Sequence, residues 1–418
     1  MTTEKEHLTD TTTDEEVYMR VAELMDSYYP NIDGPTNVVT YYAKNIDATD
    51  GYTCKVIVPK PPKKSGYVDK QPFEVIRCNS MQVTDYGYCM GFPGTDGAFK
   101  KRMRDVDLDI VHAHSPFVMG RYALKLGRQR NIPVVATMHT KFREDFERLF
   151  KKWGIFGKPI VWFMMKYIMK VFHKADSVWT VNNASRQLLV DYGYNGEIVV
   201  VNNGTDLKYP SNPDELIARV NEIHNLEGQK NVFIFVGRIA IYKNLDLLIR
   251  ALAVLKQTNP DFKMLFVGDG FDIDELKKLT TELGLDEQVI WVGRVSDREL
   301  LQGYYLRSDL FLFPSTYDTS SLVPIEAAAH KLPVLLIKDS WTAEAVTDNL
   351  NGYLALENPE AFAARIAEII ADPDKLKEVG EEAHRSVYRT WEMVSEQVME
   401  KYREIIADYQ AKHGPKKK

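Results

Sequence analysis

The chain of 418 residues is longer than one hydrophobic core usually supports, so two domains of ordinary size are expected. Its 53 basic and 59 acidic residues give a formal charge of -6, which argues against a generic nucleic-acid binder. Three cysteines without metal-ligand spacing favour a reduced, cytoplasmic setting.

Residues 1–16 are polar and acidic and contain no apolar core. We expect residues 1–20 to form a disordered acidic tail and not a signal peptide. The stretch that most resembles a membrane segment is 160–172, which carries Lys166 and Lys170. A spanning helix needs about 20 apolar residues, so this stretch should not cross a bilayer.

Short apolar runs alternate with amphipathic stretches from residue 54 to about residue 370, which is typical of βαβ units and a parallel sheet. A helix is predicted over 119–130, because Ala123, Leu124 and Leu126 recur near helical spacing and Pro133 follows. In this N-terminal half the predicted strands are 54–58, 110–112, 134–137, 177–181 and 198–201.

A second series of elements begins near residue 231, after the proline-marked connection 210–213. The predicted strands are 232–236, 263–267, 289–292, 310–313 and 334–337, and the predicted helices are 245–257, 272–283, 297–307 and 324–330. The fold class is therefore α/β, with two doubly wound domains that face one another. Ligands of such sheets bind outside the carboxyl ends of the strands, where each motif described next falls.

Two cations follow the strand 232–236, namely Arg238, directly after Gly237, and Lys243. Cations at the end of a strand suit a diphosphate, because ionised partners roughly double the strength of a hydrogen bond. The start of the next helix would add to their attraction for an anion. The alternative is that both are ordinary surface cations.

Glycine turns follow the next two strands of this series. Gly268 and Gly270 follow the strand 263–267 and would let the backbone approach a ligand closely, although such a pair is also common in tight turns. Val295 follows the strand 289–292, where a nucleobase could meet the main chain.

Two carboxylates, Asp318 and Glu326, lie eight residues apart across a loop-to-helix turn. Glu326 could accept both hydroxyls of a ribose and Asp318 could reach a sugar, although a capping or surface carboxylate is the alternative for Glu326. Residues 319–321 supply N-cap chemistry for the helix that follows. The backbone N–H groups expected to be free for a phosphate are those of Ser320, Ser321 and Leu322.

Histidines end two strands of the N-terminal half, with His112 and His114 on one strand and His139 on another. His112 and His114 would point to the same face of an extended strand. A metal site and buried structural histidines are alternatives, but the sequence offers no clear carboxylate or cysteine to complete a tetrahedral set. Two acidic patterns could in principle bind a metal. The pattern at 105–109 precedes its strand and so lies at the wrong edge of the sheet, and the pattern at 272–274 opens a helix, where acidic residues are favourable anyway. We therefore predict a metal-independent site.

Taken together, Gly237-Arg238 with Lys243, Gly268-Asp269-Gly270, and an acid followed after seven residues by Glu326-Ala-Ala-Ala resemble retaining glycosyltransferases of family 4. This family has the two-domain GT-B fold, and the resemblance covers residues 24–406. It implies an acceptor-side domain at 21–210, a nucleotide-sugar-binding domain at 211–390, and a final helix, 391–418, that crosses back to the N-terminal domain.

The resemblance also implies roles for individual residues. Arg238 and Lys243 would bind the diphosphate and Glu326 the ribose. Asp318 stands where the family has a longer glutamate that approaches the donor sugar. His114 and His139 would lie at the sugar and diphosphate, where they stabilise developing charge. The segment 31–35 resembles the family's glycine loop, which would bring the backbone at Gly34, and the side chain of Asn37, to the donor phosphates.

The sequence motifs His114-Ser-Pro-Phe117 and Thr137-Met-His139-Thr140 resemble those of the branch that glucosylates diacylglycerol. This branch implies transfer of a hexosyl group, with glucose from UDP-glucose, to a lipid hydroxyl with retention, and no cofactor beyond the donor. Residues 152–174 mix aromatic and aliphatic side chains with lysines, so they would make a peripheral contact at the inner face of the membrane. A helix buried between domain layers is the alternative.

Three other functions remain open at this point. The first is a family-4 enzyme whose acceptor is a saccharide of cell-wall or capsule synthesis. The second is a non-catalytic nucleotide-sugar-binding protein, which the short Asp318 motivates. The third is a nucleotide-sugar epimerase on the same two-domain scaffold.

Overall fold

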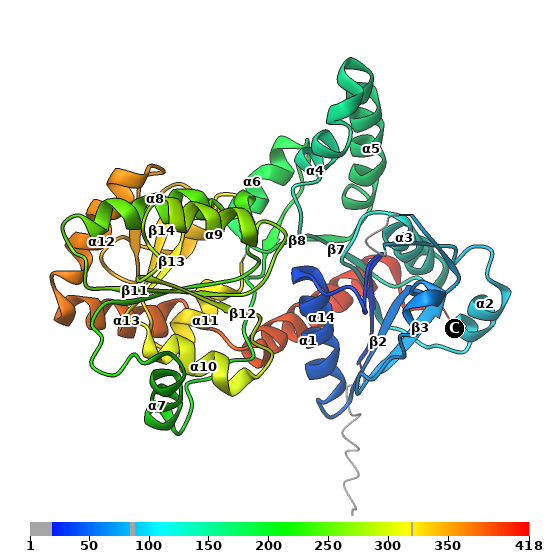
Figure 1. Cartoon of the computed structure of the whole chain (residues 1–418). Helices are drawn as coiled ribbons and strands as arrows, with labels where there is room; N and C mark the ends of the chain where they lie inside the picture. Colours follow the sequence, from blue (N-terminus) through cyan, green and yellow to red (C-terminus); the bar gives the residue numbers. More distant parts are fainter. Residues whose placement is uncertain (1–18, 84–87, 319–320, 418) are drawn as a thin grey trace, which may run out of the picture.

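The computed structural model describes residues 19–83, 88–318 and 321–417, which form two lobes (Figure 1). The N-terminal lobe is built on a parallel seven-stranded sheet in the order β3-β2-β1-β6-β7-β8-β9. Its strands are β1 (Met19–Leu24), β2 (Tyr52–Pro59), β3 (Glu74–Cys78), β6 (Ile110–Ala113), β7 (Val134–Met138), β8 (Ser177–Thr180) and β9 (Val199–Val200). A small antiparallel pair, β4 (Ser80–Gln82) and β5 (Cys89–Gly91), lies beside this sheet.

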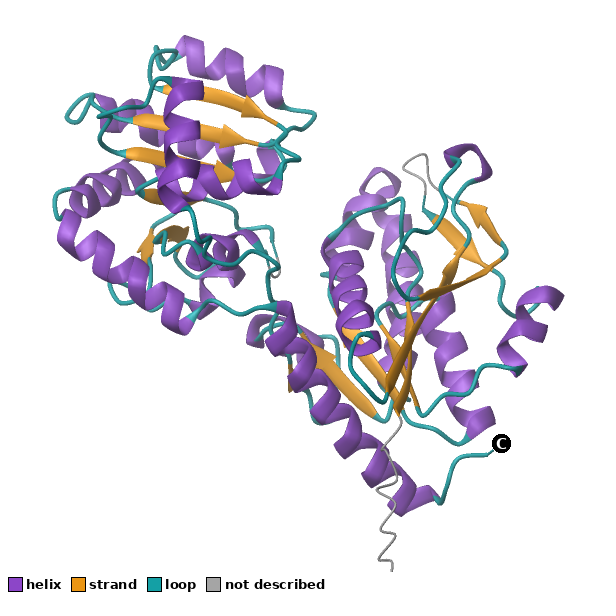
Figure 2. Cartoon of the chain, turned by 90° about the horizontal axis from the view of Figure 1, so that it is seen from below, coloured by secondary structure: helices purple, strands orange, loops and turns teal. Residues whose placement is uncertain are grey.

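Helices cover both faces of the N-terminal sheet (Figure 2). Side chains of α1 (Gly34–Asp47) contribute to one buried cluster and side chains of α2 (Gly97–Arg104) and α3 (Val118–Arg130) to another. Further along the chain come α4 (Phe142–Leu149), the 3-10 helix η2 (Lys151–Phe156), α5 (Gly157–Phe172) and α6 (Asn183–Asp191). The short η1 (Lys63–Ser65) lies between β2 and β3.

The C-terminal lobe has a parallel six-stranded sheet in the order β12-β11-β10-β13-β14-β15. Its strands are β10 (Val232–Val236), β11 (Lys263–Val267), β12 (Val289–Gly293), β13 (Leu310–Phe313), β14 (Val334–Ile337) and β15 (Tyr353–Ala355). Its helices are α7 (Pro213–His224), η3 (Ile241–Lys243), α8 (Leu245–Lys256), α9 (Ile273–Glu282), α10 (Arg298–Arg307), α11 (Val323–Ala329), η4 (Trp341–Ala345), α12 (Pro359–Ile370) and α13 (Pro373–Ser386).

All ten predicted strands occur within two residues of their expected ends, because buried runs of β-branched and aromatic side chains form them. Five strands are absent from the sequence prediction, namely β1, β3 and β15 of the two large sheets and the antiparallel pair β4 and β5. Arg20 and Glu23 interrupt the apolar pattern of β1, although β1 lies in the middle of the sheet. Residues 1–18 of the expected tail lie outside the described residues, whereas its last two residues, Met19 and Arg20, begin this strand.

The last helix, α14 (Trp391–His413), leaves the C-terminal lobe and packs on the N-terminal lobe (Figure 1). Trp391 stacks on Tyr41 of α1, with 5.1 Å between ring centroids, and Tyr402 stacks on Trp179 of β8 at 5.5 Å. The two connections between the lobes run beside each other, because Thr205 and Thr390 form a β-bridge. Chain segments that lie far apart in the sequence therefore join the lobes at one place.

The segment α4–η2–α5 projects from the N-terminal lobe (Figure 1). One face of α5 is buried, including Val161, Met165 and Ile168, while Trp162 and Phe163 on the other face are 55% and 65% exposed. The expectation of a helix buried between domain layers is therefore wrong for this outer face. Within the described residues, no helix is both long and apolar enough to cross a bilayer.

Candidate functional site

A cavity of about 520 Å³ lies between the lobes at the carboxyl ends of their strands. This volume is in the range of small-molecule and cofactor sites. Both lobes contribute to its lining. The N-terminal lobe supplies residues 32–35, 37–38, 139–141 and 145, and the C-terminal lobe supplies Gly237, Arg238, Tyr317, Asp318, Ser321 and Leu322.

The predicted site residues divide into four groups. Those that line the cavity are Gly34, Asn37, His139, Gly237, Arg238, Asp318, Ser321 and Leu322. His114 lies directly behind His139, and Lys243 lies beside Asp318. Those that are not among the lining residues are Gly268, Gly270, Val295 and Glu326. Ser320 lies outside the described residues.

Arg238 is an exposed cation in the cavity wall. Its guanidinium carbon lies 5.8 Å from the centre of the Phe271 ring. Among the residues that the structure describes, no carboxylate forms an ion pair with it. A planar guanidinium with its donors available is well suited to a phosphate. Arg238 is therefore a cation that the fold leaves available for an anionic ligand.

Lys243 and Asp318 form an ion pair in which the lysine Nζ donates to Asp318 Oδ1 at 2.5 Å. The hydroxyl of Ser315 donates to the other oxygen of the same carboxylate, also at 2.5 Å. The two side chains are only 12% and 18% exposed. Lys243 was expected to bind the diphosphate and Asp318 the sugar, whereas in the structure the two side chains pair with each other.

The glycines that follow β10 and β11 allow two strand-end loops to pack on one another. Gly237 and Gly268 have φ values of 150° and 142°, which side-chain-bearing residues rarely adopt. A Cβ atom on Gly268 would overlap the carbonyl oxygen of Gly237, and one on Gly270 would overlap that of Ile239. These glycines thus allow the loop after β11 to pack closely on the loop after β10. Their contact with a ligand stays a prediction.

Glu326 lies on the first turn of α11 and accepts a hydrogen bond from the hydroxyl of Tyr305 at 2.8 Å. Burial raises the pKa of this carboxyl above its ordinary value. The residue at the N-cap of α11 is Leu322, and no side chain makes a capping hydrogen bond there. The helix begins one residue later than capping by Ser321 requires, so the expected capping role is wrong for Ser321, while Thr319 and Ser320 lie outside the described residues.

Two residues of the N-terminal lobe that sequence reasoning missed, Glu23 and Tyr402, hold the histidines in place. Glu23 Oε2 lies 2.6 Å from His114 Nε2, and Tyr402 donates to Glu23 Oε1 at 2.9 Å. Ligand atoms of Glu23, His112 and His114 all lie within 4.8 Å of one another, and hydrogen bonds already engage them. The sequence did not identify Glu23 as a carboxylate close to these histidines. The metal-independence of the site stays a prediction.

A signal for Glu23 was present in the sequence. It is an acid inside the otherwise largely apolar hexamer Met19–Leu24, and an acid buried in a strand needs a polar partner. Tyr402 carried no such signal, because only α14 crossing between the lobes brings it to β1.

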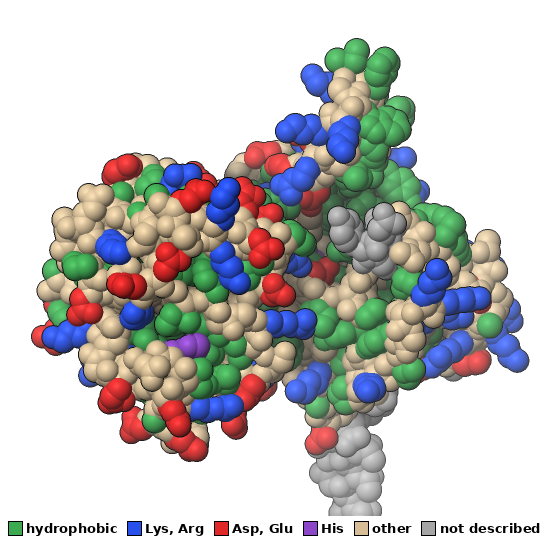
Figure 3. Space-filling model, in the orientation of Figure 1, with side chains coloured by type: hydrophobic (Ala, Val, Ile, Leu, Met, Phe, Trp, Pro, Cys, Tyr) green, Lys and Arg blue, Asp and Glu red, His purple; other side chains and the backbone are tan. Residues whose placement is uncertain are grey.

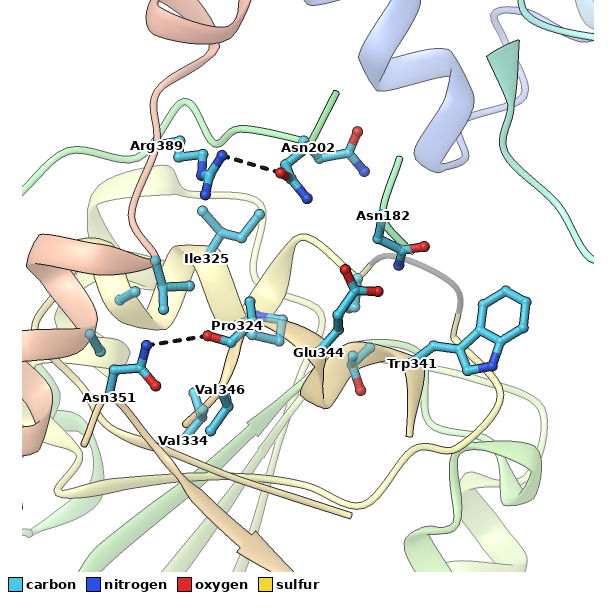
Figure 4. A pocket seen from close by; sticks show the side chains of 17 residues that line it. Asn182, Asn202, Pro324, Ile325, Val334, Trp341, Glu344, Val346, Asn351 and Arg389 are labelled. Carbon is cyan, nitrogen blue, oxygen red and sulfur yellow. Dashed lines mark hydrogen bonds between the residues drawn. The ribbon is translucent and has the colours of Figure 1, made fainter. Parts of the chain in front are cut away.

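A smaller cavity of about 80 Å³ lies on the seam between the lobes (Figure 4). There Arg389 donates to the Asn202 side chain at 3.2 Å. Glu344 of η4 accepts hydrogen bonds from the backbone N–H groups of Asn183 and Ala184, which begin α6, at 2.8 Å and 2.7 Å. A carboxylate of one lobe thus caps a helix of the other, which favours a fixed relation between them.

Comparison with known proteins agrees with this geometry. Residues 32–209 match the family described as Glycosyltransferase Family 4, and residues 216–386 match Glycosyl transferases group 1. The chain is 24% identical over 360 residues to alpha-monoglucosyldiacylglycerol synthase of Streptococcus pneumoniae, covering 85% of this chain and 79% of that one. It is 26% identical over 394 residues to a GDP-mannose-dependent alpha-mannosyltransferase of Corynebacterium glutamicum, covering 93% and 90%.

Among solved structures, Anabaena HepE in complex with UDP superposes with a TM-score of 0.73 at 20% identity, over 92% of this chain and 100% of that one. The two facing parallel-sheet lobes are therefore a GT-B fold. Because the two family matches together span both lobes, and the cavity lies between them, the chain belongs to the family-4 glycosyltransferases with the GT-B fold.

Proposed function

We propose that this glycosyltransferase moves a glucosyl group from UDP-glucose to the hydroxyl of a membrane lipid such as diacylglycerol, with retention of the α configuration. The observation that carries the proposal is the exposed, apolar and lysine-rich projection α4–η2–α5 on the lobe opposite Arg238. The similarity to alpha-monoglucosyldiacylglycerol synthase over 85% of the chain supports it.

The donor diphosphate is proposed to bind at Arg238 in the cleft cavity. Two negative charges on a leaving diphosphate need cations or N–H donors that are already in place. Arg238 supplies one such cation directly. Lys243 can supply a second if its hydrogen bond shifts from Asp318 to a phosphate oxygen, after which Asp318 is released toward the sugar.

The reaction then exchanges one bond to the anomeric carbon for another. The bond from C1 to the diphosphate oxygen breaks, and a bond from C1 to the acceptor oxygen forms on the same face. The acceptor proton passes to the departing phosphate oxygen, so the protein needs to provide no nucleophile. His139 lines the cavity, and its proposed role is to donate a hydrogen bond to an oxygen of the donor.

The projection supplies the proposed contact with the lipid surface. Large apolar side chains cover its end, and lysines lie beside them (Figure 3). Ile155 and Phe156 at the tip are 75% and 73% exposed. Aromatic and aliphatic side chains next to lysines are the pattern of elements that lie in the headgroup layer. The other exposed apolar residues of this segment are Leu149, Trp153, Trp162, Phe163 and Tyr167.

A basic groove between α3 and α5 continues this surface. It has a volume of about 120 Å³ and is lined by two apolar residues and five cations, Arg121, Lys125, Arg128, Lys170 and Lys174. Among the described residues no carboxylate forms an ion pair with any of the five. Unpaired cations near a bilayer are attracted by anionic lipids, with about 1 kcal/mol for each charge close to the surface. The occupant proposed for the whole surface is a bilayer that contains anionic lipid.

The test is a transfer assay with radiolabelled UDP-glucose and vesicles that contain diacylglycerol. We expect a glucolipid product whose linkage is α, as measured by NMR of the anomeric proton. Vesicles without diacylglycerol are the control. Label that appears only in water-soluble saccharide products would contradict the lipid acceptor, and transfer from GDP-mannose alone would contradict the donor.

A second donor has a specific observation in its favour, which is the similarity to the GDP-mannose-dependent alpha-mannosyltransferase over 93% of the chain. A saccharide acceptor in cell-wall or capsule synthesis is the matching alternative for the acceptor. Parallel assays with UDP-glucose and GDP-mannose, each with lipid and saccharide acceptors, separate the four combinations.

A further inference from the structure

A chain of buried polar side chains connects α14 to the wall of the cleft cavity. The Tyr402 hydroxyl donates to Glu23 Oε1 at 2.9 Å, and Glu23 Oε2 lies 2.6 Å from His114 Nε2. His114 Nδ1 in turn lies 3.0 Å from Nε2 of His139, which lines the cavity. Glu23 and Tyr402 are completely buried, and His114 and His139 are only 2% and 8% exposed. A buried chain of this kind transmits the state of one member to the next.

A second branch links the same tyrosine hydroxyl to His112. His112 Nδ1 lies 2.5 Å from the Tyr402 oxygen, and His112 Nε2 lies 2.6 Å from Thr137 Oγ1. A neutral imidazole donates from one nitrogen and accepts at the other. If Thr137 donates to Nε2, then Nδ1 donates to the Tyr402 oxygen, and the tyrosine proton is left for Glu23.

The protonation state of Glu23 then sets the direction of every hydrogen bond that follows. A neutral Glu23 donates its own proton to His114 Nε2, so His114 donates from Nδ1 to His139 Nε2. His139 must then carry its proton on Nδ1. An ionised Glu23 instead accepts from His114 Nε2–H, so His114 Nδ1 accepts from His139 Nε2–H. Nδ1 of His139 is then without a proton.

We propose that Glu23 is a positioning residue for glycosyl transfer, which fixes through His114 the nitrogen on which His139 carries its proton. With the proton on Nδ1, His139 can donate from that nitrogen to an oxygen of a ligand, whereas the reversed tautomer can only accept there. The role in transfer rests on the proposed function, but the control of the tautomer does not.

The environment of Glu23 favours its neutral form at pH 7. Burial raises the pKa of Glu23 to about 8, and the hydrogen bond from Tyr402 opposes this only in part. Burial lowers the pKa of His114 to about 3, so both members of the pair are uncharged. The groups that face Glu23 are Tyr42 of α1, Cys54 of β2, His112 and His114 of β6, and Tyr402 of α14. None of these is charged near neutral pH.

The direct test is the ¹⁵N chemical shift of the His139 ring nitrogens in the full chain, measured without any substrate. The signals are assigned with His139→Gln among the nine histidines. We expect the Nδ1–H tautomer at pH 6.5 and a change to the Nε2–H tautomer by pH 9. An Nε2–H tautomer at pH 6.5, or no change with pH, would overturn the proposal.

Glu23→Gln tests the same point independently, because its amide donates to His114 and accepts from Tyr402 at every pH. In the wild type, kcat should fall about tenfold between pH 7 and pH 9, as expected for loss of one proton from a group with a pKa of about 8. The Glu23→Gln variant should have the wild-type kcat at pH 7, and its kcat should not decrease between pH 7 and pH 9. An unchanged alkaline fall in Glu23→Gln would contradict the positioning role.

Tyr402→Phe serves as a second variant if Glu23→Gln does not fold. It removes the hydrogen bond that lowers the pKa of Glu23, so the alkaline fall and the tautomer change should both move to higher pH. Ser395 lies on the same helix as Tyr402, and Ser395→Ala loses a hydrogen bond from Asn45 of α1. This variant is the matched control and should move neither. If the tautomer behaves as expected but no sugar is transferred, the proposed function fails and the control of His139 by Glu23 stands.

Discussion

Lys243 Nζ lies 2.5 Å from Asp318 Oδ1, so the cation expected to bind a diphosphate is held by the carboxylate expected to approach the sugar. The two side chains are mostly buried, and a partly buried pair is screened less by salt than a surface pair. Binding of a donor at this end of the cleft therefore has to compete with an interaction inside the protein.

The first prediction concerns this competition. Asp318→Asn should bind UDP about fivefold more tightly than the wild type, because it releases Lys243 for the phosphates. Lys243→Ala should lower kcat about a hundredfold through loss of charge stabilisation in the transition state. Calorimetry with UDP and steady-state rates measure the two effects. Equal UDP affinity in Asp318→Asn would show that the pair persists when the nucleotide binds, and near-normal activity in Lys243→Ala would remove that lysine from the site.

Arg238 provides the second prediction, because it is a cation in the cavity wall and no described carboxylate forms an ion pair with it. Arg238→Ala should weaken UDP binding at least about tenfold, since hydrogen bonds to charged groups contribute about 1.5–3 kcal/mol. Arg250→Ala, an exposed arginine on α8, is the control and should bind UDP like the wild type. A crystal with UDP bound away from Arg238 would remove the basis of the donor site.

The third prediction concerns the projecting segment. Replacement of Trp162 and Phe163 together by serine should lower affinity for vesicles with anionic lipid at least about tenfold, because each buried ring contributes about 1.5–3 kcal/mol. UDP binding should not change, since the rings lie outside the cleft cavity. The control is Ile223→Ser on α7, where the side chain is 48% exposed. Vesicle sedimentation measures the affinity, and equal loss in the control would assign the effect to general hydrophobicity.

The fourth prediction is about stability. Gly268→Ala should destabilise the C-terminal lobe by about 3 kcal/mol, because a side chain is strained at its φ of 142° and would meet the Gly237 carbonyl. Gly97→Ala on α2 of the N-terminal lobe is the control and should leave the C-terminal lobe unchanged, since its Cβ would meet nothing within 4 Å. Denaturant titration, followed by the fluorescence of the tryptophans in the C-terminal lobe, compares the two variants. An unchanged free energy of unfolding in Gly268→Ala would mean that the two loops separate readily.

The fifth prediction follows from the raised pKa of Glu23. Between the ordinary glutamate pKa and about 8, the unfolded chain loses a proton that the folded chain keeps, so the free energy of unfolding falls as pH rises. Glu23→Gln has no such proton, and its stability relative to the wild type should therefore increase from pH 5 to pH 8. Thermal melts across this range measure the difference. Glu404→Gln, an exposed position on α14, should stay parallel to the wild type.

Much of the fold could be predicted from residue order alone. The strands β10, β13 and β14 are continuous apolar runs, and both faces of a parallel sheet are buried, so their positions were predicted to the residue. Arg238 and Asp318 could be assigned to one site because both follow such strands. β1 was missed because its Glu23 is stabilised by partners on other elements, which no local pattern contains.

The sequence by itself determined the two-sheet architecture, the family and the strand ends where the site lies, because these depend on local periodicity and short motifs. Tertiary structure alone decided that Lys243 pairs with Asp318 and that the glycines of one loop accommodate another. It also decided that Tyr402, from the far end of the chain, reaches Glu23. The reason is physical: burial and hydrogen bonding join groups by distance in space, and α14 brings together residues 379 positions apart.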